Sequence, residues 1–278
     1  MDELRIALEL ATEEELQQIT QVLFQPKFNP LDYLQTPQPL AIQSQNWDAW
    51  IDSLDKRFRY LAADGFTVLR GNTETLSYRK ILIQVCLYLK IPYSQQMSTT
   101  DIESEIFLNL VRNTWNKLST SEKNSLQHKV SHALAETKPP APLPVQIQHN
   151  PAKFLLAGSG LVAVNSIVKN WLLKHIAKQF ALHFASYQVA KNAIIKGGTL
   201  TVLQSKFALN AAKKGMATNI TRYSATRTVL GLMSSVMWGW LIADLGWKAI
   251  ATNYGRIVPI VFTLAQIRLT RGDYCFAN

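Results

Sequence analysis

Apolar residues recur at helical spacing along the first half of the chain. One buried helix is suggested by Leu76, Ile81, Val85, Leu87 and Leu89 with Tyr78 and Tyr88, and a second apolar stripe lies within residues 101–118. The apolar positions of the second stripe are Ile102, Ile106, Leu110 and Trp115. No run alternates convincingly between apolar and polar residues, which is the pattern of a half-exposed strand. The pattern therefore predicts an all-α protein.

Three short motifs mark expected helix starts. Thr12–Glu15, Thr100–Glu103 and Ser119–Glu122 each place a hydroxyl three residues before a glutamate. In a capping box, the hydroxyl accepts from the third helical N–H, and the glutamate accepts from the N–H of the cap residue. We therefore expect a helix to begin at each of these positions.

The second half of the chain contains apolar stretches that lysines and arginines interrupt. None reaches the roughly 18 to 20 apolar residues of a membrane-spanning helix. In the best candidate, residues 228–247, seven Leu, Ile or Val favour insertion by roughly 2 to 4 kcal/mol, and Asp244 opposes it by up to about 3 kcal/mol. This balance favours shallow or hairpin insertion over a full span. Buried helices of a soluble bundle are the alternative interpretation.

Residues 169–191 carry the clearest amphipathic pattern of this half. Large apolar side chains fall on one side of the expected helix, and Lys174 and Lys178 fall on the other. Such a helix can lie in the headgroup layer with its lysines near anionic lipid. The alternative is a core helix with a solvated lysine face. The side chains expected to contact a membrane, including three tryptophans from the second half, are Leu173, Lys174, Ile176, Lys178, Phe180, Phe184, Trp238, Trp240 and Trp247.

Prolines suggest a division of the chain. Five of the eleven prolines lie within residues 139–151. Proline lacks a backbone N–H and disfavours regular helix, so this stretch is expected to be an extended, semi-rigid linker. We therefore expect a soluble helical domain at 1–138 and a basic, apolar, helical region at 152–278 that associates with a membrane.

Charge is distributed unevenly between these parts. Residues 1–138 hold 14 Lys and Arg against 17 Asp and Glu, whereas residues 139–278 hold 15 against 2. The net charges are thus −3 and +13, which sum to the +10 of the whole chain. A half that basic attracts polyanions, namely anionic lipid, nucleic acid or an acidic protein surface. The scatter of its lysines among apolar residues favours lipid over nucleic acid.

A glycine motif raises the question of a dinucleotide site. Gly158–Ala163 matches the pattern G-x-G-x-x-A. Lys174 and Lys178 stand where an acidic, ribose-binding residue would be needed, and no βαβ pattern surrounds the motif. We therefore predict no cofactor, and interpret the small residues as allowing close helix contact.

Two histidines on a predicted helix are the only residues that suggest a metal. His128, His132 and Glu136 could share one helix face, but the internal glutamate of the H-E-x-x-H motif is absent. Cys86 and Cys275 stand alone, without the spacing of a zinc site. A solvated polar face is the favoured interpretation, so no metal site is predicted. An enzyme that uses these three residues stays a further hypothesis.

Several segments resemble the bacterial YaaW family. They are the opening run Asp2–Leu16, the segment Tyr78–Leu82, the stretch Met97–Trp115 and residues 256–268. The middle part of that family is distantly similar to the ubiquinol–cytochrome c chaperone domain, a helical domain that holds a newly made membrane subunit during assembly of a respiratory complex. The resemblance implies a helical, chaperone-like protein, and it carries no catalytic residue over to this chain.

These observations lead to one expected function and two alternatives. We expect a non-enzymatic, membrane-associated protein that binds a protein partner, as an assembly factor or chaperone does. The alternatives are a nucleic-acid-binding protein that uses the basic half and a soluble all-helical protein. The acidic residues Asp2, Glu3 and Glu9 near the first position are incompatible with a secretory signal, so we expect a cytoplasmic location, peripheral to or partly inserted in the inner membrane.

Overall fold

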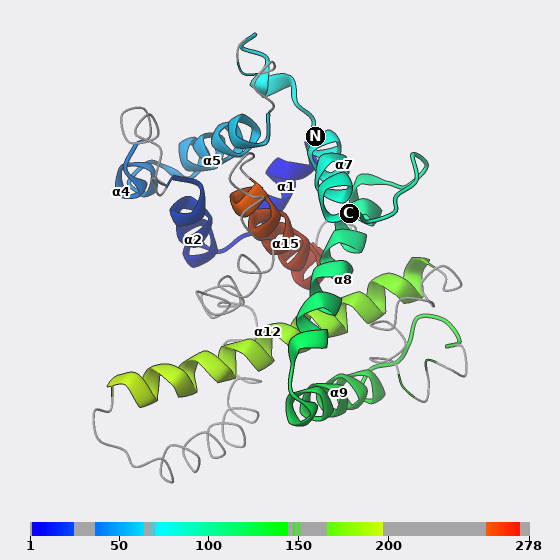
Figure 1. Cartoon of the computed structure of the whole chain (residues 1–278). Coiled ribbons are helices and arrows are strands. Elements are labelled where there is room, and N and C mark those ends of the chain that lie inside the picture. The colour runs from blue at the N-terminus through cyan, green and yellow to red at the C-terminus, as the bar shows by residue number, and fades with distance from the viewer. Residues whose placement is uncertain are drawn as a thin grey trace. The chain divides into compact units, whose positions relative to one another are not determined.

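The chain is helical throughout the part that its computed structural model describes, which is residues 2–24, 37–63, 70–143, 166–196 and 254–272 with positions 68, 147 and 150. These residues form nine α-helices and one 3-10 helix, with no strand among them (Figure 1). The all-α prediction is confirmed for them. The chain divides into two compact units, one of Met1–Val111 with Leu241–Asn278 and the other of Arg112–Trp240.

The first unit combines helices from both ends of the sequence. They are α1 (Glu3–Glu9), α2 (Glu13–Phe24), α4 (Pro39–Gln43), α5 (Trp47–Ala62), η1 (Thr73–Thr75), α7 (Tyr78–Leu89), the first part of α8 (Thr99–Lys117) and α15 (Tyr254–Arg271). In Figure 1, α15 lies among α1, α2, α5 and α7, and it packs against each of them.

Two of the three predicted capping boxes are confirmed. At the start of α2, Thr12 Oγ1 accepts from Glu15 N at 3.3 Å, and Glu15 Oε2 accepts from Thr12 N at 2.8 Å. Ser119 and Glu122 make the same reciprocal pair at the start of α9 (Thr120–Ala135). Both helix starts thus follow from local hydrogen bonding.

The third predicted capping box, at Thr100–Glu103, is wrong. The box lies two residues earlier, where Ser98 Oγ accepts from Asp101 N at 3.1 Å and Asp101 Oδ2 accepts from Ser98 N at 3.3 Å. Asp101 thus accepts the hydrogen bond from the cap N–H that a glutamate accepts in the usual capping box. Glu103 is therefore free of any capping role, and its side chain enters the interior of the unit.

Helix α7 buries the first part of the predicted apolar set, whereas Tyr88 and Leu89 near its end are half-buried. Leu76, Ile81 and Val85 are buried, but Leu87 is 64% exposed. In an α-helix, residues four apart share a face, so Ile81 and Val85 face the interior while Leu87, two positions on, faces outward. The helix ends at Leu89, and the next residue, Lys90, adopts a left-handed conformation with φ of 57°.

Helix α15 completes the core of the first unit. Its residues Gly255–Ile267 are all buried. The ring of Phe262 stacks on that of Phe107 with centroids 5.0 Å apart, and the ring of Tyr254 stacks on that of Tyr88 at 4.2 Å. Burial of so many apolar side chains is a large stabilising contribution, on the order of 1.5 to 3 kcal/mol for each large one.

The position of α15 differs from the expected division of the chain. The sequence grouped residues 254–271 with the membrane-associating region 152–278, whereas they pack in the unit built from the N-terminal helices. The physical reason is that an apolar helix needs surrounding apolar faces, which α1, α2, α5 and α7 supply. The described start of the expected linker, residues 139–143, contains neither helix nor strand.

The second unit has α9 and α12 (Ser166–Lys196) as its main described helices, and they pack against each other. Helix α12 contains the whole predicted amphipathic segment 169–191, so that helix prediction is confirmed. Leu126, Val130 and Leu134 form the buried stripe of α9. The ring of Trp115, from the end of α8, lies 6.5 Å from that of Phe180 on α12.

Among the described helices, none combines the length and the apolar character that a bilayer crossing requires. The marginal segment 228–247 and the glycine motif Gly158–Ala163 both lie outside the described residues.

Candidate functional site

Arginines near the end of α15 bind buried glutamates of the N-terminal helices. Arg271 Nη2 donates to Glu15 Oε1 at 2.6 Å, and its other terminal nitrogen donates to Glu15 Oε2 and to the Leu10 carbonyl. Glu15 is fully buried and also caps the start of α2. Two parallel N–H···O bonds of this kind fix both the distance and the orientation of the two side chains.

A second buried pair lies three residues earlier on α15. Arg268 Nε donates to Glu103 Oε2 at 2.8 Å, and Arg268 Nη2 donates to the Glu3 carbonyl at 2.6 Å. The other oxygen of Glu103 accepts from the Tyr78 hydroxyl at 2.7 Å. Glu3 in turn accepts from Thr99 Oγ1 at 3.1 Å. The network therefore joins α1, α7, α8 and α15.

Burial changes the acidity of this network. It raises the pKa of Tyr78 well above its ordinary value, and the negative charge of Glu103 raises it further. Burial also raises the pKa of Glu103, although the Arg268 guanidinium and the Tyr78 hydrogen bond oppose this. Tyr78 and Glu103 are 0% and 2% exposed, so a substrate cannot reach them in this conformation. The two pairs, Arg268 with Glu103 and Arg271 with Glu15, hold α15 against the N-terminal helices, and we call them the α15 clamp.

A further buried arginine joins the start of α1 to α5. Arg59 Nε donates to Asp55 Oδ1 at 3.0 Å, and its terminal nitrogens donate to Asp2 and to the Leu76 carbonyl. Burial disfavours the charge of Arg59, but the hydrogen bonds and charges of Asp55 and Asp2 outweigh this and leave its pKa raised. This arginine holds the N-terminal segment in place.

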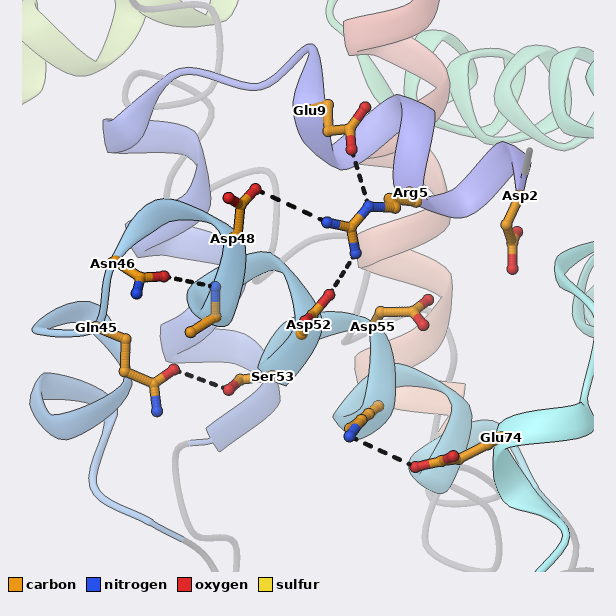
Figure 2. Close-up of polar contacts among 12 residues, drawn as sticks. Asp2, Arg5, Glu9, Gln45, Asn46, Asp48, Asp52, Ser53, Asp55 and Glu74 are labelled. Atoms are coloured by element: carbon orange, nitrogen blue, oxygen red, sulfur yellow. Dashed lines mark hydrogen bonds and ion pairs between the residues drawn. The ribbon is translucent and has the colours of Figure 1, made fainter.

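A more exposed network also links α1 to α5 (Figure 2). Arg5 reaches from α1 toward Asp48 and Asp52 on α5, and its Nε lies 2.9 Å from Glu9 Oε1 on its own helix. The hydrogen bond to Asp52 is the main cause that raises the pKa of Arg5. Because the three acids are largely solvent-exposed, we expect each pair to contribute less than about 1 kcal/mol.

The predicted membrane-contact residues divide into three groups. Leu173, Ile176 and Phe180 on α12 are buried within the second unit, so the structure brings them together on a covered face. Lys178 is exposed and Lys174 is half-buried, and burial together with the charge of Lys178 lowers the pKa of Lys174. The residues whose side chains lie outside the described part are Phe184, Trp238, Trp240 and Trp247.

The predicted histidine face occurs on α9. His132 Nδ1 lies 3.4 Å from Glu136 Oε1, and the rings of His128 and His132 have centroids 6.5 Å apart. His132 and Glu136 are both largely exposed. Among the residues that the structure describes, no group of three or more His, Cys, Asp or Glu side chains lies close enough to hold a metal ion.

Comparison with known proteins finds a partial relative. This chain is similar to the UPF0174 protein YaaW. The match is 35% identical over 75 residues with the proteins of Escherichia coli O157:H7 and of strain K12, and it covers 27% of this chain. The chain thus matches 31% of the length of these relatives. No family model matches the chain, and no solved structure matches it.

The similarity to YaaW confirms the resemblance to that family as a distant, partial one. The pairing of Arg268 with Glu103 and of Arg271 with Glu15 was not predicted from the sequence. The sequence does contain a sign that these two glutamates are buried. Glu15 lies four residues before Ile19, and Glu103 lies four residues before Phe107. An acid in register with the apolar stripe of a helix is expected to be buried and therefore paired.

Proposed function

We propose that this protein is a non-enzymatic, membrane-associated helical protein that binds a protein partner, as an assembly factor or chaperone does. In this proposal, α12 and the chain between α12 and α15 contact an anionic membrane surface. The first unit contacts the partner. The surface is the cytoplasmic face of a bacterial inner membrane.

The observation that supports the proposal most is the excess of positive charge in residues 139–253, which precede α15. Three of the fifteen Lys and Arg of residues 139–278 lie on α15, and two of these bind Glu15 and Glu103 within the first unit. The other twelve lie in residues 139–253, where Asp244 is the single acidic residue. A stretch with this excess attracts a polyanion, and each lysine near an anionic bilayer contributes about 1 kcal/mol.

The composition of the same stretch favours lipid among the polyanions. Its cations alternate with apolar segments, and three of its four tryptophans, Trp238, Trp240 and Trp247, lie close together near its end and are of a type enriched at bilayer interfaces. Helix α12 adds an exposed cation, Lys178, next to an apolar stripe. Both features suit a helix in the headgroup layer.

Exposed apolar side chains on the first unit support the partner-binding part of the proposal. Leu40 on α4 is 71% exposed, and Leu87 on α7 is 64% exposed. Trp47 and Tyr60 on α5 are also exposed, and tryptophan and tyrosine are enriched at the energetic centres of protein interfaces. These side chains offer contact area for a protein partner.

Flotation of the full chain with vesicles tests the membrane proposal. We expect the protein to float with phosphatidylglycerol-containing vesicles, to float less as salt is raised, and to stay behind with neutral vesicles. The variant Lys178→Glu should float less than the wild type. The matched control Lys56→Glu alters an exposed lysine of α5 and should float as the wild type does. Absence of flotation with anionic vesicles would show the membrane proposal to be wrong.

Nucleic-acid binding through the same cations is the second candidate, since the charge excess alone suits both polyanions. Duplex DNA binding with a steep salt dependence, together with failure to float, would favour it.

A further inference from the structure

A histidine lies at the interface between α9 and α12. His175 Nε2 on α12 is 3.3 Å from Thr137 Oγ1, two residues beyond the end of α9. Thr137 Oγ1 also lies 3.1 Å from the Ala133 carbonyl and 3.3 Å from the Leu134 carbonyl. The hydroxyl and the imidazole are thus within hydrogen-bond distance, and the tautomer of His175 sets which of them donates. The ring of Trp171 meets that of His175 edge-on at 5.0 Å.

The charges around His175 disfavour a second proton. Lys174 is its neighbour on α12, and Lys178 lies one turn further on. The same interface buries half of the imidazole, and burial is the largest cause that lowers the pKa of His175, followed by Lys178 and Lys174. A protonated His175 in this place would be a third cation in a partly desolvated cluster.

Further charged or titratable groups lie on or next to the two helices. On α9, His132 and Glu136 pair with each other on an exposed face. Lys138 follows Thr137 directly and adds a further positive charge in the sequence there. His183 lies two turns beyond His175 on α12 and is buried. Glu136, the acidic residue that directly precedes Thr137, thus pairs with His132.

We propose that the contact between α9 and α12 is a pH-sensitive latch, in which protonation of His175 favours separation of the two helices and presents Leu173, Ile176 and Phe180 to a membrane surface. This inference rests on the proposed membrane association, because it specifies how the covered apolar stripe of α12 becomes available. The stripe and His175 lie within the same two turns of α12, so loosening there frees the α9 side of the stripe, and Phe180 must also leave the ring of Trp115.

The direction of the pH effect follows from linkage. The docked state binds the second proton of His175 less readily than a separated α12, in which the imidazole is solvated. The docked contact is therefore fully stabilised above the ordinary histidine pKa, about 6.5, and is weakened as pH falls below it. Acidification favours the open form.

Hydrogen exchange of the full chain without vesicles tests the latch itself. After correction for intrinsic exchange rates, we expect amides of residues 168–183 to lose protection between pH 7.5 and pH 5.5. His175→Gln keeps a donor near the position of Nε2 without the ability to become charged, so it should lose little protection. The control His128→Gln removes an exposed histidine of α9 and should behave as the wild type does. Equal loss of protection in wild type and His175→Gln would overturn the latch.

Flotation at the two pH values tests the link to membranes. Wild type should bind phosphatidylglycerol vesicles several-fold more tightly at pH 5.5 than at pH 7.5, and His175→Gln should show a clearly smaller change. If wild type fails to float at either pH while exchange still depends on His175, the membrane proposal fails and the latch stands. If binding rises equally in both proteins, general titration explains the rise and the link between the latch and membrane binding is refuted.

Discussion

Glu103 and Arg268 lie 165 residues apart in the chain and form a buried ion pair at 2.8 Å between α8 and α15. The pair is completed by the Tyr78 hydroxyl on α7 and by the Glu3 carbonyl on α1. A charge buried in this way is stable only while its partners are present. The network therefore makes the docking of α15 a condition for the stability of the helices around it.

Removing the cation of this pair should strongly destabilise the first unit. Arg268→Met keeps the apolar stem but leaves Glu103 buried without its counter-charge, so we expect a loss of roughly 3 to 5 kcal/mol in the free energy of unfolding. Denaturant unfolding measures it. Arg5→Met removes an exposed cation that also binds carboxylates, and should cost less than about 1 kcal/mol. Similar losses in the two variants would contradict the buried clamp.

Stability should also depend on the protonation of Glu103. Because burial raises its pKa in the folded chain, the folded state holds this proton to higher pH than the unfolded state does. The stability that this bound proton adds to the folded state is complete below the ordinary glutamate pKa. It is lost as pH rises through the pKa of Glu103 in the folded chain. From about pH 4, just below the ordinary glutamate pKa, to about pH 8, Glu103→Gln should thus lose less stability with rising pH than the wild type. Thermal unfolding across this range checks the slope, and parallel curves would argue against it.

The position of the α8 cap can be tested by two neighbouring hydroxyls. Ser98→Ala removes the acceptor for Asp101 N and should cost about 1 kcal/mol. Thr100→Ala changes an exposed residue inside the first turn and should have a much smaller effect. Circular dichroism during urea unfolding compares them. A larger effect at Thr100 would restore the start that the sequence motif suggested.

Deletion of α15 should disrupt the first unit as a whole. A chain ending at residue 253 loses the apolar side chains of Gly255–Ile267 from the core and leaves Glu15 and Glu103 without cations. We expect broad, weakly cooperative unfolding in place of a sharp transition. Calorimetry distinguishes the two. A sharp, unchanged transition in the shortened chain would mean that α15 is dispensable.

Local features of the fold were predictable because neighbouring residues determine them. The capping boxes at Thr12 and Ser119 and the helix over 169–191 need only short-range spacing, and each occurs as expected. The box at Thr100 was misplaced because Ser98 with Asp101 competes for the same helix start. Two overlapping motifs cannot be ranked from spacing alone.

The clamp was not predictable because it depends on long-range pairing. From the sequence, we expected the cations of the basic second half to face an external polyanion. Part of that complementarity is internal, since Arg268 and Arg271 bind Glu103 and Glu15. Charge totals do not distinguish a cation that pairs within the chain from one that faces outward. Burial and distance are needed for that distinction.

The place of α15 in the fold also has a consequence during protein synthesis. Glu103 leaves the ribosome 165 residues before its partner Arg268. At about 5 to 20 residues per second, this is a delay of roughly 10 to 30 s. During that time the helices around the clamp present an open apolar surface and two unpaired acids. We expect such a nascent chain to keep these groups exposed until α15 emerges, because only then can the two acids pair with Arg268 and Arg271.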